Sequence, residues 1–477
     1  KFLDICLAIS SERDRESLLS AILDTAMELN RCDAGTLYLL EDDGLHFCRM
    51  VTKSQNVRQG GHDAPISLPP VPLQDNYIAA YAVMHGCSVR IDDVRADNRF
   101  DFSGARRYDD MTGYYTGTML AVPLRNDKGE IIGALQLINA LDEDGEIAPF
   151  DPDMQDISEA AASLAAISLT NMQYTEQIKQ LLNSLVSALS TAIDERTPYN
   201  ANHTRNMVRY AERFLDRLSE ENHPLAFGES KRAAFIMSVW LHDVGKLVVP
   251  LDVMDKNSRL GPALDKIRER FRVIGLLARL EAARGRCSEE EAEAKISELA
   301  ADMSFIESVN NKGFMPDEDL AKVDALAAKS FTDEEGSERP FLLPEELVCL
   351  KIRKGTLSEE ERRIMESHVL ITSRILEKVY FPKSYAKVAE WASAHHELLN
   401  GKGYPRGLKA EDIPFEVRLL TVLDVFDALT ARDRPYKPPM PAEKAFAILH
   451  DMAKDGGIDE DILKLFEESK AWEEKDA

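Results

Sequence analysis

The stretch Leu419–Leu429, LLTVLDVFDAL, sets two carboxylates, Asp424 and Asp427, in an almost continuous apolar run. Such a run is typical of a buried helix, where a carboxylate is costly unless it is paired or binds a metal. Because the two carboxylates are three residues apart, they share roughly one helix face. The stretch therefore predicts a core helix on which Asp424 is a candidate metal ligand and Asp427 a candidate supporting residue.

Outward from this run, helix and turn patterns continue back to about Gln180, which predicts an all-α region over residues 180–477. Within it, residues 261–336 are charged, rich in Ala and Glu and poor in large apolar residues. This composition predicts a helical insertion outside the core. A seven-residue apolar spacing over residues 154–193 predicts a long connecting helix that pairs with a second copy; packing against its own domain is the alternative.

Residues 1–169 alternate helical and strand patterns. Ser17–Leu29 repeats apolar residues at helical spacing. Two hairpins are predicted from four strand-like runs, Gly35–Leu40 with Leu45–Val51 and Met119–Arg125 with Ile131–Asn139. The predicted fold class is multidomain: an α+β domain with an antiparallel sheet and flanking helices, joined by a long helix to an all-α domain.

Length and charge exclude several classes of protein. With 477 residues the chain is long enough for two or three domains. Its net charge of −25 disfavours binding to a nucleic acid polymer, although a small anionic substrate needs only a local group of cations. Six cysteines without a C-x-x-C pair predict reduced thiols, and no apolar run is long enough for a membrane span, so we expect a cytoplasmic protein. A start at Lys1 rather than Met leads us to expect further residues upstream.

Candidate metal ligands gather in the helical region. His242 and Asp243 follow an apolar helix, and an imidazole beside a carboxylate can bind one divalent cation while the second carboxylate oxygen reaches another. For this pair alone, a helix-end histidine without a function is the alternative. His395 and His396 follow core-facing residues and precede a sharp turn. Burying two imidazoles without partners is costly, which favours metal binding.

The order of these motifs resembles the HD-GYP branch of the HD superfamily of metal-dependent phosphohydrolases. The resemblance runs from about Ser187 to Met452, with the insertion at about 261–336 as its main interruption. It rests on these pieces: Asn202-His203-Thr204, His242-Asp243-Val244-Gly245-Lys246, Lys354–Glu361 leading to His368, His395-His396-Glu397, Gly403-Tyr404-Pro405, Asp424–Leu429, and Arg434-Pro435-Tyr436-Lys437.

The resemblance implies a role for each matched position. One metal would be bound by His203, His242, Asp243 and Asp424, and a second by His368, His395 and His396, with Asp243 as the bridge. Asp243 and Lys246 would be catalytic, and substrate would be held by Lys246, Arg434, Lys437 and Tyr404. Asp427 and Glu397 would support the ligands from behind. The expected cofactors are two divalent transition-metal ions, with iron or manganese favoured by mixed nitrogen and oxygen ligands.

Three positions depart from the family pattern. Tyr199 stands one helical turn before His203, where some relatives carry a carboxylate for a third metal, which favours two metals here. Asn400 stands where an Asp is usual, before the Gly403-Tyr404-Pro405 turn. The insertion at 261–336 splits a segment that is normally continuous, and it could be a lid over the metals, a partner surface or a decoration without a catalytic role.

The N-terminal domain, residues 1–169, resembles a GAF sensory domain. The resemblance rests on Ala34–Leu39, Val122-Pro123-Leu124 and Gly133–Asn139, followed by Phe150. Ala140 stands where nucleotide-binding members carry Lys, so an unidentified small-molecule ligand, haem binding and pure dimerisation all stay open. We expect a homodimer formed through this domain and the connecting helix.

The resemblance as a whole implies a bacterial second-messenger enzyme under GAF control. It would be a metal-dependent phosphodiesterase that hydrolyses cyclic di-GMP to linear pGpG or GMP. A phosphodiesterase for 3′,3′-cyclic GMP-AMP is the alternative, because the metal motif does not specify the bases. A non-catalytic ligand-binding sensor or scaffold is the second alternative, although all seven ligand positions are retained.

Overall fold

The computed structural model describes residues 14–196, 202–431 and 440–473. They form two compact units, which divide between Leu181 and Leu182. Within the described ranges, no helix has both the length and the apolar character needed to cross a membrane.

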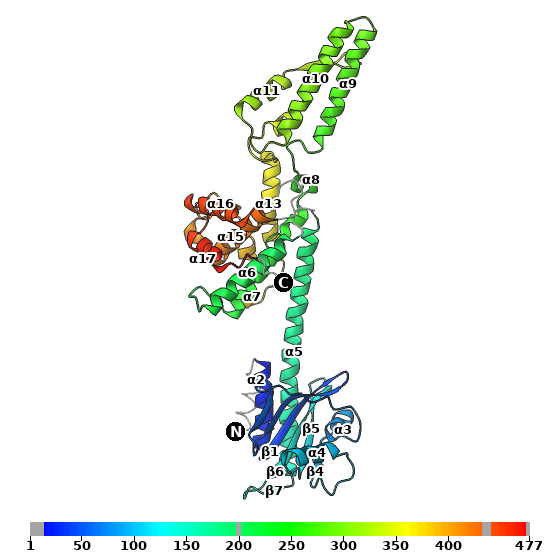
Figure 1. The fold of residues 1–477 in the computed structure, drawn as a ribbon, viewed down its shortest axis with the longest axis vertical. Helices are drawn as coiled ribbons and strands as arrows, with labels where there is room; N and C mark the ends of the chain where they lie inside the picture. The colour runs from blue at the N-terminus through cyan, green and yellow to red at the C-terminus, as the bar shows by residue number, and fades with distance from the viewer. Residues whose placement is uncertain (1–13, 197–201, 432–439, 474–477) are drawn as a thin grey trace. The chain divides into compact units, whose positions relative to one another are not determined.

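The first unit is built on an antiparallel sheet in the order β3-β2-β1-β6-β5-β4, with β7 paired to β6 (Figure 1). Both predicted hairpins are present, since β1 pairs with β2 and β5 with β6. The strands are β1 (Cys32–Glu41), β2 (Gly44–Thr52), β3 (Val57–Gly60), β4 (Val89–Ile91), β5 (Met119–Arg125), β6 (Ile131–Leu141) and β7 (Ile147–Ala148).

Different helices cover the two faces of this sheet. Leu37 and Leu39 of β1 share a core with α2 (Arg15–Leu29) and the first half of α5 (Pro152–Asp194). Tyr38, between them, packs with α3 (Ile78–His85) on the opposite face. The unit also contains α4 (Ser103–Thr112). This alternation is that of a strand with both faces buried, and the predicted α+β class is confirmed.

The second unit has one large helical core. Its helices are α6 (His203–Glu220), α7 (Glu229–Leu241), η1 (Val244–Val248), α8 (Leu251–Met254), α13 (Glu359–Leu376), η2 (Lys383–Tyr385), α14 (Val388–Ala392), η3 (Ala410–Asp412), α15 (Phe415–Thr430), α16 (Ala442–Lys454) and α17 (Glu460–Ser469). The LLTVLDVFDAL stretch lies in α15, where Leu419, Leu423 and Phe426 belong to this core. The prediction of a buried helix there is confirmed.

The insertion is helical, apart from one short hairpin, and has a hydrophobic core of its own, separate from the large core of the second unit. It consists of α9 (Ala263–Ala283), α10 (Glu289–Asn310), α11 (Asp317–Ala327), β8 (Ser330–Thr332), β9 (Glu338–Pro340) and α12 (Pro344–Leu350). Figure 1 shows α9 beside α10, and the buried residues of α9 are Ile267, Phe271, Ile274 and Ala278. Few apolar residues suffice because they recur on one helix face. The packed segment continues past residue 336 to Leu350.

One local feature of this unit was not predicted. Strands β8 and β9 form a short antiparallel hairpin within the otherwise helical region. Asp333 makes the turn between them, because its carboxylate accepts hydrogen bonds from the backbone N–H groups of Glu335 and Ser337. A three-residue strand is too short to give an alternating sequence pattern.

Candidate metal centre

The structure brings all seven predicted ligands together from different parts of the second unit. They lie at the start of α6 (His203), the end of α7 (His242), before η1 (Asp243), within α13 (His368), after α14 (His395 and His396) and within α15 (Asp424). All are buried except His396, whose side chain is 27% exposed. His396 is therefore the ligand of the cluster that is most open to solvent.

Threonine hydroxyls and a glycine fix the turns that carry these ligands. The backbone N–H of Gly245 donates to the Thr372 hydroxyl oxygen (3.0 Å), and that hydroxyl donates to the carbonyl of His242 (3.1 Å). On the other side, the Thr421 hydroxyl donates to the carbonyl of His395 (2.8 Å). Thr372 and Thr421 were not predicted, because a threonine within a helix carries no distinguishing sequence signal.

Backbone carbonyls orient three of the imidazoles in the same way. His242, His368 and His395 each place Nδ1 at 2.6–2.7 Å from the carbonyl oxygen three residues earlier in the chain. A carbonyl can only accept, so Nδ1 must carry the proton. The lone pair of each Nε2 then remains available for a cation, and a hydrogen bond of this kind is how metal-binding histidines are usually oriented.

The two oxygens of Asp243 face two separate groups of imidazoles. Its Oδ1 lies 3.4 Å from Nε2 of His368 and 3.8 Å from Nε2 of His395. Its Oδ2 lies 3.2 Å from Nε2 of His242 and 3.7 Å from Nε2 of His203. Asp424 completes the second group, with Oδ1 at 3.3 Å from Nε2 of His203. A carboxylate in this position can bridge two cations.

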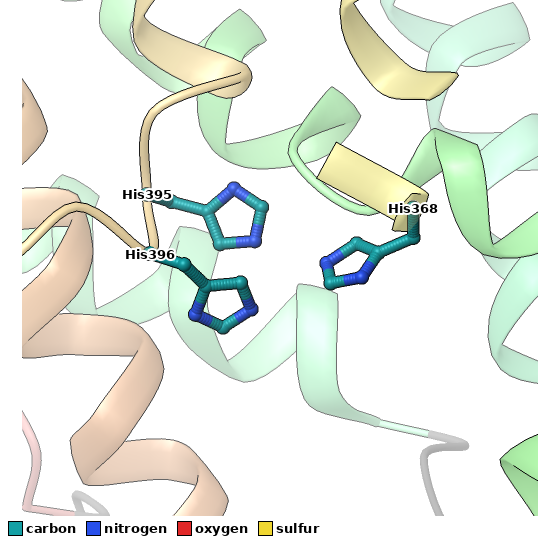
Figure 2. A group of neighbouring side chains, drawn as sticks. All are labelled: His368, His395 and His396. Carbon is teal, nitrogen blue, oxygen red and sulfur yellow. The ribbon is translucent and has the colours of Figure 1, made fainter. Parts of the chain in front are cut away.

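Unsatisfied atoms at the centre show that the residues fit a metal. Nε2 of His368, Nε2 of His395 and Oδ1 of Asp243 are buried and have no hydrogen-bond partner. Figure 2 shows the rings of His368, His395 and His396 gathered around one space, and their ligand atoms lie within 4.8 Å of one another. Buried polar atoms without partners cost free energy, whereas a cation among them would satisfy all three.

The electrostatics of the cluster suit bound cations. Burial lowers the pKa of His395 well below its usual value and that of His396 to about 4, so both rings are neutral and can bind a metal. For His203, burial acts in the same direction, but hydrogen bonds with Asp424 and Asp427 outweigh it and raise the pKa to about 10. The carboxylates therefore favour positive charge at Nε2 of His203, where a metal ion could replace the proton.

Three further predicted residues lie against this cluster. Nζ of Lys246 is 2.6 Å from Oδ2 of Asp243, and it helps to hold the pKa of that carboxyl well below its usual range against the opposing effect of burial. Oδ2 of Asp427 is 2.7 Å from Nδ1 of His203, behind the ligand. The ring of Tyr404 lies 4.7 Å from that of His396, beside the exposed ligand.

Glu397 has a different role from the one predicted. Its buried carboxylate accepts hydrogen bonds from the backbone N–H groups of Arg406 (2.7 Å) and Leu408 (2.8 Å). It thus holds the turn that follows Tyr404 rather than supporting a metal ligand directly. Sequence adjacency to His396 suggested a shared environment, but neighbouring side chains on this tight turn point in different directions.

Replacing Glu397 with Gln is expected to lower the free energy of unfolding by about 1–3 kcal/mol, because one buried N–H loses its acceptor. Metal content should stay that of the original chain. Chemical denaturation and metal analysis measure the two quantities, with Glu411→Gln on the exposed surface of η3 as the control. A loss of metal at unchanged stability would restore the ligand-supporting role.

Some predictions lie outside the described residues, and within the described ranges no hydrogen bond or ion pair joins the insertion to the cluster. Arg434, Lys437 and Tyr199 fall in the ranges that the structure does not describe. At the base of the insertion, Lys256 pairs with Glu361 (2.7 Å) and Arg259 donates to the carbonyl of Ile352 (2.9 Å). Within the described ranges, none of the hydrogen bonds or ion pairs of residues 261–350 ends on a metal ligand, so they do not support a lid.

Comparison with known families gives two matches along the chain. Residues 14–169 match the model of the GAF domain, and residues 341–462 match the model of the HD domain. The second match includes His368, His395, His396 and Asp424, while His203, His242 and Asp243 precede it. The predicted resemblance of both regions is confirmed.

Relatives that match this chain include proteins named as phosphodiesterases of cyclic nucleotides. A 3′3′-cGAMP-specific phosphodiesterase 3 of Vibrio cholerae is 41% identical over 21% of this chain and 21% of its own length. A cyclic di-GMP phosphodiesterase of Thermotoga maritima is 42% identical over 21% of this chain and 27% of its own. A cyclic di-GMP phosphodiesterase response regulator of Xanthomonas campestris is 39% identical over 21% of this chain and 26% of its own. The matched stretches thus span about a quarter of these relatives.

Proposed function

Because residues 14–169 match the GAF domain and residues 341–462 match the HD domain, we propose that the chain is a metal-dependent phosphodiesterase of the HD-GYP branch that hydrolyses cyclic di-GMP to linear pGpG or GMP. One observation carries this proposal above the others. The Asp243 carboxylate turns one oxygen to His368 and His395 and the other to His203 and His242. An arrangement of this kind holds two cations close enough to act on one phosphodiester.

The residues of the cluster form two sets of ligands, one for each of two cations. His203, His242 and Asp424 with one oxygen of Asp243 would hold one cation, and His368, His395 and His396 with the other oxygen would hold the second. Two such cations polarise the phosphoryl oxygen and lower the pKa of a bound water. Mixed nitrogen and oxygen ligands favour iron or manganese.

Lys246 and Tyr404 supply the substrate contacts of this proposal. The Lys246 ammonium lies beside the bridging carboxylate, where it can also attract a phosphate oxygen. Tyr404 lies beside His396, the ligand open to the outside, and its ring offers a face on which a base can stack. Arg434 and Lys437 remain candidates for the phosphate from the sequence alone.

A phosphodiesterase for 3′,3′-cyclic GMP-AMP is a second candidate, because relatives named for that substrate and for cyclic di-GMP match at similar identity. The ligands alone cannot separate the two, since base choice depends on contacts around the cluster. A sensor or scaffold without turnover is the remaining alternative.

Metal analysis and turnover of the purified chain test these candidates together. We expect two iron or manganese ions per chain, and hydrolysis of cyclic di-GMP that a chelator abolishes and manganese restores. Preference for cyclic GMP-AMP would favour the second candidate. A chain that binds metal but cleaves neither nucleotide would favour the sensor, and a chain that binds no metal in any form would sink the enzymatic proposal.

We further propose a cytoplasmic homodimer in which the GAF domain, through an unidentified ligand, controls the HD domain. Ile178, Leu181 and Leu185 of α5 are 65%, 61% and 55% exposed at spacings of three and four residues, which suits pairing with the same helix of a second copy. The described cysteines are free, in keeping with a reducing compartment.

A further inference from the structure

The C-terminal end of α5 contacts the segments that carry both sides of the metal cluster. α5 begins in the first unit and ends at Asp194, inside the second unit. Three residues at this end, Thr191, Asp194 and Arg196, make side-chain hydrogen bonds to other elements of the second unit. None of the three was singled out in the sequence.

Asp194 and Thr191 hold the beginning of α6. The Thr204 hydroxyl donates to Oδ1 of Asp194 (3.1 Å), and both side chains are buried. Nη2 of Arg205 donates to the hydroxyl oxygen of Thr191 (3.1 Å). Thr204 and Arg205 directly follow His203, so these bonds fix the turn from which that imidazole projects.

Arg196 holds η1 from the same side. Its Nη1 donates to the carbonyl of Lys246 (2.6 Å), and its Nη2 donates to the carbonyl of Val249 (3.3 Å). A guanidinium that donates to two carbonyls fixes the orientation of the backbone between them, which a single flexible ammonium does less well. The Lys246 side chain projects from this stretch toward Asp243.

We propose that Asp194 and Arg196 are positioning residues, which tie His203 through α6, and Lys246 through η1, to the end of α5. The proposal rests on the proposed function for the reaction that these residues serve. Its physical basis is that a good metal site tolerates little displacement, because metal–ligand distances vary there by only about 0.2 Å. Bonds that set the backbone next to a ligand therefore set its affinity for the metal.

The Asp194 bond can be tested through metal affinity, without any turnover. Thr204→Val removes the hydroxyl and keeps the shape, whereas Thr204→Ser keeps the hydroxyl. Titration of the metal-free full chain with Mn²⁺ should show one of two binding events weakened by about 10-fold in Thr204→Val, the lower range for loss of a supporting bond. Thr204→Ser should stay close to the original chain. Equal affinities in all three proteins would overturn the role of Asp194.

The Arg196 bonds can be tested through the split between KM and kcat. Arg196→Met, which keeps length but donates no hydrogen bond, should raise KM for cyclic di-GMP by about 10-fold, as expected for a lost charged hydrogen bond. Its kcat and its bound manganese should remain near those of the original chain, and Arg196→Lys should recover part of the loss. Unchanged KM, or equal losses in Arg196→Met and Arg196→Lys with metal release, would overturn the proposal.

Arg213→Met is the matched control, because Arg213 also donates to a backbone carbonyl, that of Glu473, but far along α6 from His203. It should leave KM and metal affinity unchanged.

The metal titration and the KM measurement also distinguish failure of this proposal from failure of the proposed function. If the original chain binds two Mn²⁺ and cleaves no cyclic dinucleotide, the proposed function fails. The comparison of Thr204→Val with Thr204→Ser then still decides the role of Asp194. Calorimetric measurement of cyclic di-GMP binding to Arg196→Met decides the role of Arg196.

Discussion

Asp243→Asn is expected to empty both metal positions and to lower kcat/KM for a cyclic dinucleotide on the order of 1,000-fold, since two metals contribute several kcal/mol to the transition state. The amide keeps the shape of the side chain but has one oxygen instead of two. The amide therefore cannot present an oxygen to both pairs of imidazoles. The carboxylate presents one oxygen to His368 and His395 and the other to His203 and His242.

A comparison with Asp424→Asn gives this prediction its sharpest form. Asp424 faces His203 through Oδ1 at 3.3 Å and a single imidazole of the other group, with Oδ2 at 3.7 Å from Nδ1 of His396, whereas Asp243 faces two imidazoles on each side. Metal analysis should therefore find close to no metal in Asp243→Asn but about half the original content in Asp424→Asn. Circular dichroism is needed alongside, because Lys246 loses its ionised partner in Asp243→Asn and a buried charge left unpaired destabilises the fold.

Asp216→Asn serves as the surface control, since its carboxylate is exposed and pairs with Arg232 on the outside of the unit. Both its metal content and its activity should stay unchanged. Full metal content in Asp243→Asn would mean that this carboxylate bridges nothing, and the two-metal mechanism would then have to be abandoned.

Gly245→Ala is expected to separate η1 from α13 and to destabilise the second unit by about 3 kcal/mol or more, at the upper end for overpacking. A Cβ at this position would lie 1.9 Å from the carbonyl oxygen of His368 and 2.7 Å from the backbone N of Thr372. Both are backbone atoms of α13, which cannot turn aside as a side chain can. Because Asp243 precedes Gly245 by two residues, the separation should also move Asp243 away from His368.

Thermal unfolding and metal analysis measure these two consequences. We expect a lower Tm and less than the original metal content in Gly245→Ala. Gly313→Ala in the same unit is the control, because a Cβ there meets no atom within 4 Å. If Gly245→Ala matched that control in both quantities, α13 and η1 would not be packed as closely as the structure places them.

Parts of the fold were readable from the sequence because they depend on local order. The hairpins of β1 with β2 and β5 with β6 follow from alternating residues around short turns, and α15 follows from its apolar run. The insertion shows the limit of such patterns. Its composition predicted a helical insertion outside the core but not the separate core that a few apolar residues on one face of α9 form once α10 packs against it.

The supporting residues of the metal cluster could not be predicted in the same way. Thr372, Thr421 and Arg196 act through hydrogen bonds to backbone carbonyls that lie far away in the sequence. Nothing in their neighbours along the chain marks them. Glu397 shows the opposite error, since its position beside His396 suggested a part in the cluster, whereas its carboxylate binds the backbone of a turn.

By itself, the sequence determined which side chains can bind metal, because imidazole and carboxylate chemistry is a property of the residue, and the ordered motifs from His203 to Asp424 selected them. Only the tertiary structure decided which of these side chains lie together in each of the two ligand groups. The division of Asp243 between two groups of imidazoles arises where η1 packs against α13 and α14 packs against both α7 and α15. This packing sets distances that no spacing along the chain contains.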